Sequence, residues 1–400
     1  MKKILILTAI VCMTAGAAGQ TQFDRLLKAK AFIEAGKPDD AVNLLTEALK
    51  VTQESRLYLE RAEAFIQTGD YSKAIDDLNN SNLIVPGSGE YQLARIFALK
   101  RNIPEALGHL EKHLSSNFKK SEKEILLDPA FSLIENSQEW KLFWKKERYL
   151  ELEKGISEFE FYIKAGKTDE AREVLTELSG RYRDKDEIKF AEATIKLVSS
   201  NYPEAIRIMN ELLKSNENNE SYLRLLGKAY EGSGNYSGAS DIYSRLISME
   251  VPDASLYLMR AESYRRTGEL NRALADVEKY IDLYPEDKEG LRLAGKIFSA
   301  SGDNLRALEY FSRNLQLHPN DPGCYTDRAD TYFLSKSWEW AVKDYSMALD
   351  LDPGNMNAWL NKGISLINTG KAGDACFDFR KSFSLGNKRA AEYISRYCIK

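Results

Sequence analysis

Two of the three histidines, His109 and His113, stand four residues apart, a spacing that would place both imidazoles on one face of a helix. Such a pair could ligate a metal ion. The segment "HLEKH" lacks the His-Glu-x-x-His order of the zinc proteases, however, and no third ligand stands nearby in the sequence. Because His113 also falls at a position expected to pack between helices, the sequence predicts no metal site.

A glycine-rich segment, "GSGNYSG" at residues 232–238, is similar in composition to a phosphate-binding loop. It lacks the Gly-Lys-Ser/Thr ending of that loop and follows a predicted helix instead of a strand. No Gly-x-Ser-x-Gly nucleophile elbow occurs, and the carboxylates are spread along helix faces as on a solvated surface. We therefore expect neither an enzyme nor a bound cofactor.

The composition limits the other classes of function. The 400 residues include 56 Lys and Arg against 60 Asp and Glu, and this balance gives no basic excess for nucleic acid. Hydrophobic residues make up 43% of the chain, which is enough for a substantial core. No apolar stretch of about 20 residues occurs, so we expect no transmembrane helix.

Residues 1–20, "MKKILILTAIVCMTAGAAGQ", have the layout of a cleaved secretory signal peptide. Lys2 and Lys3 precede a short apolar run, and small residues follow it. Cys12 could suggest a lipid attachment site, but Val11 before it is bulkier than the small residue that such cleavage requires, so a lipoprotein is disfavoured. The predicted mature chain, with 54 basic and 60 acidic residues, would be an exported, soluble and mildly acidic protein, which we expect in the periplasm.

One arrangement of small residues recurs along the chain. Counting back from Ala375, an alanine in the same setting occurs every 34 residues as far as Ala171, and the upstream copies are 32 or 33 residues apart. A second small residue lies twelve positions before each alanine, except where Phe159 replaces it. The alanines are Ala41, Ala74, Ala106, Ala171, Ala205, Ala239, Ala273, Ala307, Ala341 and Ala375. The preceding small residues are Ala29, Ala62, Ala94, Ala193, Gly227, Ala261, Gly295, Ala329 and Gly363.

Each period is predicted to be a pair of antiparallel helices. Small side chains at fixed offsets let two helices approach closely, glycine permits the reversal, and a proline such as Pro285 or Pro353 ends the second helix. One hairpin cannot bury its apolar face alone, so neighbouring copies must stack. Recurring aromatics such as Phe65 and Phe298 should fill the contacts, where burial of each contributes on the order of 1.5 to 3 kcal/mol.

This pattern resembles the tetratricopeptide repeat family. The last full copy has Trp359, Gly363, Leu366, Gly370, Ala375 and Phe379 in the signature spacing of the family. The copy before it has Tyr325, Ala329, Tyr332, Ala341, Tyr345, Ala348 and Pro353. The resemblance covers about residues 22–389. It implies an all-α fold, a right-handed α-solenoid of helix-turn-helix repeats, with a concave surface that binds peptides or protein segments.

The repeats divide the chain into segments. Residues 22–118 are predicted to form an N-terminal arm of three repeats, residues 152–389 a C-terminal arm of seven repeats, and residues 390–400 a capping helix. Residues 119–151 lack the paired small residues and are expected to form a degenerate helical pair. This joint contains the bulky aromatics Phe131, Trp140, Phe143, Trp144 and Tyr149. We expect them to pack inside a splayed joint, and the alternative is an exposed binding site.

In this family the first helices of successive repeats line the binding groove. The residues one place after the small site are Lys228, Glu262, Lys296 and Asp330, and the surrounding arginines are Arg224, Arg265, Arg266 and Arg292. Opposite charges on adjacent helices could neutralise one another as a structural ladder, each exposed pair contributing about 0 to 1 kcal/mol. Alternatively, the surplus arginines could bind a carboxylate-bearing or acidic segment. Leu26, Leu59 and Tyr91 occupy sites where chaperone-binding members have cations or amides, which disfavours chaperone binding.

Three cysteines remain after removal of the predicted signal peptide, so at least one thiol must be unpaired within the monomer. Cys376 lies on the last second helix, and Cys398 lies on the capping helix that should pack there. A disulfide between them would close a loop of about 20 residues and stabilise this end by roughly 3 kcal/mol. The remaining cysteine is Cys324.

We therefore predict a non-enzymatic scaffold that binds a protein or peptide segment on its concave surface in an exported compartment, by analogy within an envelope assembly or secretion complex. One alternative is a regulatory or substrate-presenting partner of a separately encoded enzyme. Another is a self-assembling architectural component. We expect no nucleic acid, metal ion or cofactor as a partner.

Overall fold

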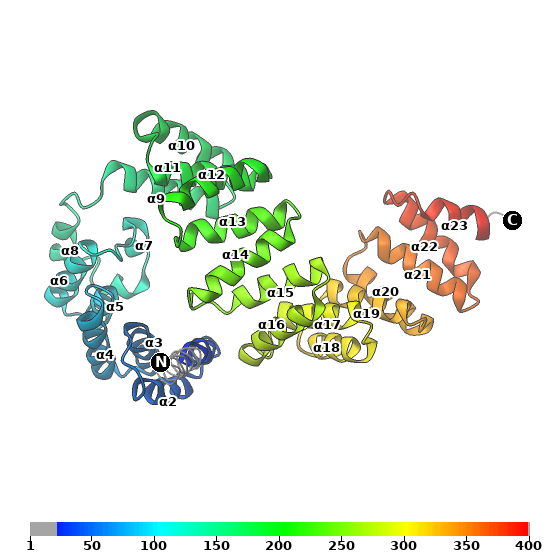
Figure 1. Ribbon diagram of the computed structural model, residues 1–400, viewed down its shortest axis with the longest axis horizontal. Coiled ribbons are helices and arrows are strands. Elements are labelled where there is room, and N and C mark those ends of the chain that lie inside the picture. Colours follow the sequence, from blue (N-terminus) through cyan, green and yellow to red (C-terminus); the bar gives the residue numbers. More distant parts are fainter. Residues whose placement is uncertain (1–21, 399–400) are drawn as a thin grey trace, which may run out of the picture. The chain divides into compact units, whose positions relative to one another are not determined.

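The computed structural model describes residues 22–398, which form helices joined by short turns and no β-strand (Figure 1). The predicted signal peptide, residues 1–20, lies outside the described residues. The first helices of the regular hairpins are residues 22–34, α3 (Ser55–Thr68), α5 (Glu90–Leu99), α9 (Glu151–Lys164), α11 (Asp186–Val198), α13 (Glu220–Gly232), α15 (Ser255–Thr267), α17 (Lys288–Ala300), α19 (Pro322–Leu334) and α21 (Met356–Asn368). Their second helices are α2 (Pro38–Leu49), α4 (Tyr71–Ile84), α6 (Ile103–Leu114), α10 (Thr168–Tyr182), α12 (Tyr202–Ser215), α14 (Tyr236–Ser248), α16 (Leu270–Leu283), α18 (Asn304–Leu317), α20 (Trp338–Leu351) and α22 (Ala372–Ser384).

The chain divides into two compact units. Unit 1 extends to Gly234 and includes Ser248–Asp253, and unit 2 consists of Asn235–Ile247 and the residues from Ala254 onward. This boundary lies inside the predicted C-terminal arm, whereas the joint at residues 119–151 lies within unit 1. No helix among the described residues is long and apolar enough to cross a membrane.

The paired small residues lie where the two helices of a hairpin meet. Ala62 of α3 and Ala74 of α4 are completely buried in one core cluster. At Gly295 and Gly363, an aromatic ring fills the space beside the glycine. A Cβ atom added to Gly363 would come within 2.5 Å of the Phe379 ring. The fixed offset in the sequence thus corresponds to the closest approach of two helices, where a larger side chain has no room.

The turn inside each hairpin contains one residue in the left-handed conformation. It lies five positions before the alanine of the second helix, and in seven hairpins it is a glycine. The glycines are Gly36, Gly69, Gly166, Gly234, Gly268, Gly302 and Gly370. Arg101, Ser200 and Lys336 occupy the same position in the other three hairpins, with φ values of 56°, 58° and 57°. The reversal therefore requires a positive φ whichever residue is present.

The joint in unit 1 consists of short elements, α7 (Glu122–Leu126), the 3-10 turn η1 (Pro129–Phe131) and α8 (Gln138–Phe143). Phe131 and Trp140 stack at 5.2 Å between ring centroids inside a core shared with α5 and α6, and Phe143 and Trp144 pack against it partly buried. Phe131, Trp140 and Tyr149 are 1%, 5% and 5% exposed. The idea of an exposed aromatic site is therefore wrong for Phe131 and Trp140, because their rings fill this core, and Tyr149 is also almost fully buried.

The end of unit 2 is formed by α23 (Ala390–Tyr397), which packs on α22 through Phe379 and Tyr393 with ring centroids 5.1 Å apart. Cys376 and Cys398 form a disulfide with their Cα atoms 5.6 Å apart, and it closes a loop with a sequence separation of 22. Cys324 is a buried free thiol. Burial raises its pKa to about 12, so this thiol stays protonated at neutral pH.

Candidate protein-binding surfaces

The two histidines at metal-binding spacing make separate contacts in unit 1. Nδ1 of His109 lies 2.6 Å from Oε2 of Glu90. His113 is buried, and its Nε2 accepts a hydrogen bond from the backbone N–H of Lys120 at 3.1 Å. Burial, assisted by Lys120, lowers the pKa of His113 to about 4, so this imidazole is neutral at neutral pH. No group of His, Cys, Asp and Glu within residues 22–398 has the arrangement of a metal site.

Two of the predicted groove residues, Arg224 and Lys228, lie on α13 in unit 1. Arg224 donates from Nε to Glu220 at 2.8 Å and from Nη1 to Asp253 at 2.7 Å. Lys228 is exposed and has no ion pair within the described part of the chain. The arginine is thus neutralised locally, whereas the lysine remains available to a ligand.

Three further groove residues, Glu262, Arg265 and Arg266, form a cluster on α15 in unit 2. Arg265 donates from Nε and Nη2 to the two carboxylate oxygens of Glu262, both at 2.7 Å, and Nε of Arg266 donates to the same carboxylate at 2.6 Å. Burial opposes ionisation of Glu262, but the hydrogen bonds from the two guanidiniums outweigh it and lower the pKa of this carboxyl. One carboxylate therefore serves two arginines.

Arg292 and Lys296 of α17 share a carboxylate that the sequence analysis did not identify. Oδ2 of Asp327, on α19, lies 2.5 Å from Nε of Arg292 and 3.5 Å from Nζ of Lys296. Asp330, one turn further along α19, accepts hydrogen bonds from the Tyr345 hydroxyl and from the side-chain amide of α21 residue Asn361. Burial raises the pKa of Asp330 above its usual range. Asp330 is therefore bound to neutral donors, and Asp327 is the partner of the cations.

Only the contacts of Asp327 join adjacent first helices as the ladder interpretation requires, because Glu262 pairs with two arginines of its own helix. Among the described residues, the four groove cations on α15 and α17 pair with two carboxylates, Glu262 and Asp327. A guanidinium has five N–H donors and a carboxylate has two oxygens, so several donors remain unfilled. The first-helix surface of unit 2 can thus accept additional carboxylate oxygens from a ligand.

A recurring buried ion pair was also missed by the sequence analysis. Arg328 of α19 donates from Nε and Nη2 to Asp344 of α20 at 2.6 and 2.8 Å, and its Nη1 donates to Ser312 at 3.1 Å. The equivalent pairs are Arg61 with Asp77 and Arg260 with Asp276. The signal was present, because the arginine precedes the small residue and the aspartate follows the alanine by three places. These pairs join the helices of a hairpin and belong to its core.

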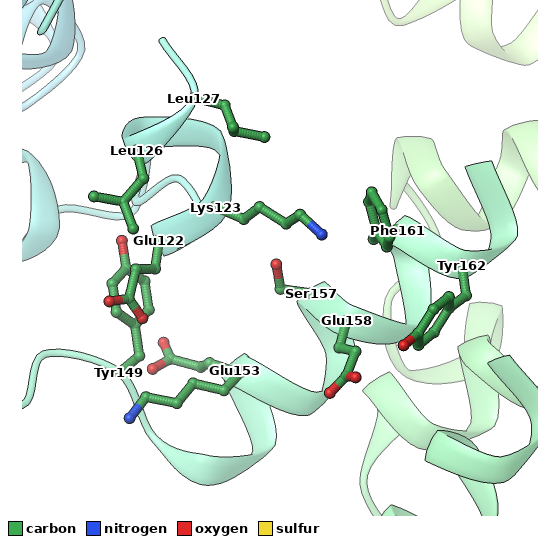
Figure 2. A pocket seen from close by; sticks show the side chains of 11 residues that line it. Glu122, Lys123, Leu126, Leu127, Tyr149, Glu153, Ser157, Glu158, Phe161 and Tyr162 are labelled. Atoms are coloured by element: carbon green, nitrogen blue, oxygen red, sulfur yellow. The ribbon is translucent and has the colours of Figure 1, made fainter. Parts of the chain in front are cut away.

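A pocket of about 490 Å³ lies between α7 and α9 in unit 1 (Figure 2). Leu126 and Leu127 line it from α7 and its C-terminal end, and Phe161 lines it from α9. The ammonium of Lys123 extends across the pocket and lies 2.9 Å from the centroid of the Phe161 ring. Tyr149 forms another part of the wall, fixed by a hydrogen bond from its hydroxyl to the carbonyl of Lys120 at 2.7 Å.

Comparison with known proteins agrees with the repeated hairpins. A family model described as a tetratricopeptide repeat matches residues 26–81, 190–255 and 258–322. A crystal structure of a tetratricopeptide repeat protein from Parabacteroides merdae is similar with a TM-score of 0.51 and 19% identity over 62% of this chain and 98% of that chain.

Two other similar structures have lower TM-scores. The Cut9–Hcn1 hetero-tetramer of APC/C gives 0.49 with 13% identity, over 93% of this chain and 89% of that chain. Yeast Tom70 gives 0.42 with 14% identity, over 95% of each chain. Among curated proteins, no sequence matches this chain.

Proposed function

Because this chain belongs to the tetratricopeptide repeat family, we propose that it is a non-enzymatic scaffold that binds a segment of another protein on the first helices of unit 2. The segment carries carboxylates, from acidic side chains or from a C-terminus. The observation that carries this proposal is the sharing of Glu262 and Asp327 by four cations on α15 and α17. Guanidinium groups bind carboxylates in a bidentate manner, so a ligand carboxylate can use the donors that these two residues leave open.

The proposed ligand approaches Arg266 and Lys296 first. Their side chains are 50% and 34% exposed, whereas those of Arg265 and Arg292 are 19% and 25% exposed and more fully engaged within the chain. The two exposed cations provide the initial electrostatic attraction, and this attraction weakens as salt is added. The less exposed cations, Arg265 and Arg292, hold Glu262 and Asp327 in place, so the ligand does not have to order these carboxylates.

The compartment is part of the same proposal. Residues 1–20 have the layout of a secretory signal peptide, and the disulfide between Cys376 and Cys398 suits an oxidising compartment. We place the scaffold in an exported compartment, within an envelope assembly or a secretion complex.

The test is site-specific photo-crosslinking in the native cell. A benzophenone amino acid replaces Arg266 on the first helix α15 in one variant and replaces Asn271, an exposed residue of the second helix α16, in the control. We expect a crosslink from position 266 to one acidic segment of another protein, and none from position 271. Crosslinks from 271 alone would contradict the proposed surface, and crosslinks to this chain alone would indicate a self-assembling component.

The crosslinked segment, made as a synthetic peptide, then tests the charges. Arg266→Glu and Lys296→Glu should each weaken binding about fivefold or more at low salt, because each replaces an attraction by a repulsion. Lys388→Glu, at an exposed lysine in the turn before α23, is the matched control and should leave the affinity unchanged. Equal affinities for all four proteins would contradict the role of the first-helix cations.

A further inference from the structure

Helix α9 lacks a neighbour that seven other first helices possess, namely α3, α5, α11, α13, α17, α19 and α21. In the regular stack, the first helix contacts the second helix of the preceding hairpin, as α5 contacts α4 and α17 contacts α16. Helix α9 contacts α10, α11 and the short α7. Helix α7 has 5 residues, against 14 in α4 and in α16. At a rise of about 1.5 Å per residue, it covers about 7.5 Å of a helix that is about 21 Å long.

The surface of α7 and α9 that no full second helix covers is apolar in its centre. Leu127 is 70% exposed, Leu126 is 45% exposed and Phe161 is 42% exposed, and all three line the pocket between α7 and α9 (Figure 2). On its other side α9 is fixed against its hairpin partner, because a Cβ atom added to Gly155 would lie 2.6 Å from Leu178 of α10. The apolar residues of α9 are therefore presented by a rigid helix.

A second pocket, of about 890 Å³, shares Tyr149, Glu153 and Ser157 with the first. The two pockets thus lie along the same part of α9. The two pockets meet at Glu153 and Ser157, so the surface of α9 is open on both sides of these residues.

The charges around the first pocket favour a basic ligand. Glu153 pairs with Lys119 at 2.8 Å, and Lys154 pairs with Glu147 at 2.9 Å, so these groups are already neutralised. Within the described residues, the remaining carboxylates of the lining, Glu122 and Glu158, form no ion pair.

Lys123 is the remaining cation of this lining, and its ammonium lies over the Phe161 ring. This contact shows that the ring attracts a cation in the pocket. Apolar residues flanked by carboxylates on both α7 and α9 match a helix with an apolar stripe and basic edges.

We propose that this surface, formed by Glu122, Leu126, Leu127, Glu158 and Phe161, binds a basic amphipathic helix of another protein. The ligand helix takes the position of the missing second helix before α9. Its apolar stripe covers the two leucines and Phe161, and its lysines or arginines pair with Glu122 and Glu158. This site is separate from the proposed acidic-segment site of unit 2 and selects ligands of opposite charge.

The experiment measures the fluorescence anisotropy of a labelled 14-residue amphipathic helix of Leu and Lys titrated with the full chain. A helix with the same pattern of Leu and Glu is the control ligand. We expect Phe161→Ala to raise the Kd of the Leu/Lys helix about tenfold through lost apolar burial, and Glu158→Lys to raise it about fivefold at low salt. Both side chains are exposed, so neither change removes a core contact.

Matched controls keep the result specific to this surface. Phe377→Ala on α22 and Glu177→Lys on α10 alter exposed residues of the same types outside the pocket and should leave the Kd unchanged. Lys296→Glu should also leave it unchanged, which separates this proposal from that of unit 2. Equal affinity for the Leu/Glu helix, or an unchanged Kd in both pocket variants, would overturn the proposal. So would a change confined to self-association in sedimentation, since the surface would then bind a second copy of the chain.

Discussion

At the scale of single residues, an arginine and an aspartate 16 positions apart join the two helices of a hairpin in three copies. The pair of Arg328 and Asp344 shows why both must be present, since their side chains are 19% and 3% exposed and two hydrogen bonds connect them. Removing charge from water costs free energy that the partner largely offsets. Burial of one of these charges without its partner would therefore destabilise the protein more than the loss of both charges.

Asp344→Ala is expected to lower the free energy of unfolding by about 3 to 5 kcal/mol, because it leaves the Arg328 guanidinium buried without a counter-charge. The double replacement of Arg328 by Met and Asp344 by Leu should cost less, because it removes both charges and keeps the volume. Urea unfolding followed by circular dichroism measures both. A double variant that is less stable than the single one would contradict this account.

Glu60 of α3, unlike Asp344, is a largely buried carboxyl with only a distant counter-charge. Its side chain is 19% exposed, and the nearest ammonium, on Lys30, is 4.0 Å away. Burial, assisted by Glu63 and Glu34 and opposed by Lys30, raises the pKa of Glu60 from 4.5 to about 7. Between these two pKa values the folded state binds more protons than the unfolded state, so stability must fall as the pH rises through this window.

Glu60→Gln is therefore expected to stabilise the protein at about pH 8 by on the order of 1 to 3 kcal/mol relative to its effect at about pH 4.5. The measurement is the urea midpoint of both proteins at the two pH values. Glu177→Gln, at an exposed glutamate of α10, is the control and should show no such difference. A gain of the same size at both pH values would contradict the protonation argument.

At the scale of the helices, the sequence is a reliable guide wherever both small residues are present. Ala62 and Ala74 predicted a close helix contact, and the structure buries both completely in one cluster. The same rule gave no information for residues 119–151, where Trp140 stands 34 positions after Ala106. A tryptophan in place of the alanine prevents the close approach, so the ring instead packs beside α6 and the helices around it are short.

The left-handed turn residue gives a prediction at the same scale. Lys336 has a φ of 57°, a conformation that costs a residue with a Cβ atom about 1 to 2 kcal/mol and glycine almost nothing. After the greater chain entropy of glycine in the unfolded state is subtracted, Lys336→Gly should stabilise the hairpin by about 0.5 to 1 kcal/mol. Thermal unfolding measures the gain. Lys371→Gly, at an exposed lysine with a φ of −97°, is the control and should stabilise nothing.

At the scale of the whole molecule, the family and the all-α solenoid could be predicted from the repeat period, because a repeated hairpin defines its own contacts. The partners of the groove charges could not be predicted. Asp327 stands two positions before Ala329, the small residue of its helix, and the comparison of groove positions between repeats did not include it. It becomes the partner of Arg292 only because two first helices lie side by side. Pairing across helices depends on the geometry of the stack, which a one-dimensional pattern does not contain.

The disulfide of unit 2 provides a test at this scale. Cys398→Ser should destabilise the attachment of α23 by about 3 kcal/mol, the amount expected for opening a loop of this length. Hydrogen exchange should become faster in α23 and remain unchanged in α21. Alkylation of the unreduced protein followed by mass spectrometry should leave Cys376 and Cys398 unmodified, and labelling of both would contradict the bond.

The short helices at the joint affect how the stack of repeats in unit 1 unfolds. A stack of repeats ordinarily loses structure from its two ends, because only the terminal copies lack a neighbour. Helix α9 contacts the 5-residue α7 in place of a full second helix, so the stack in unit 1 is weakened within its own length. Unfolding can start at α9 and spread in both directions. A ligand helix bound beside α9 would join two short cooperative segments of the stack into one long segment.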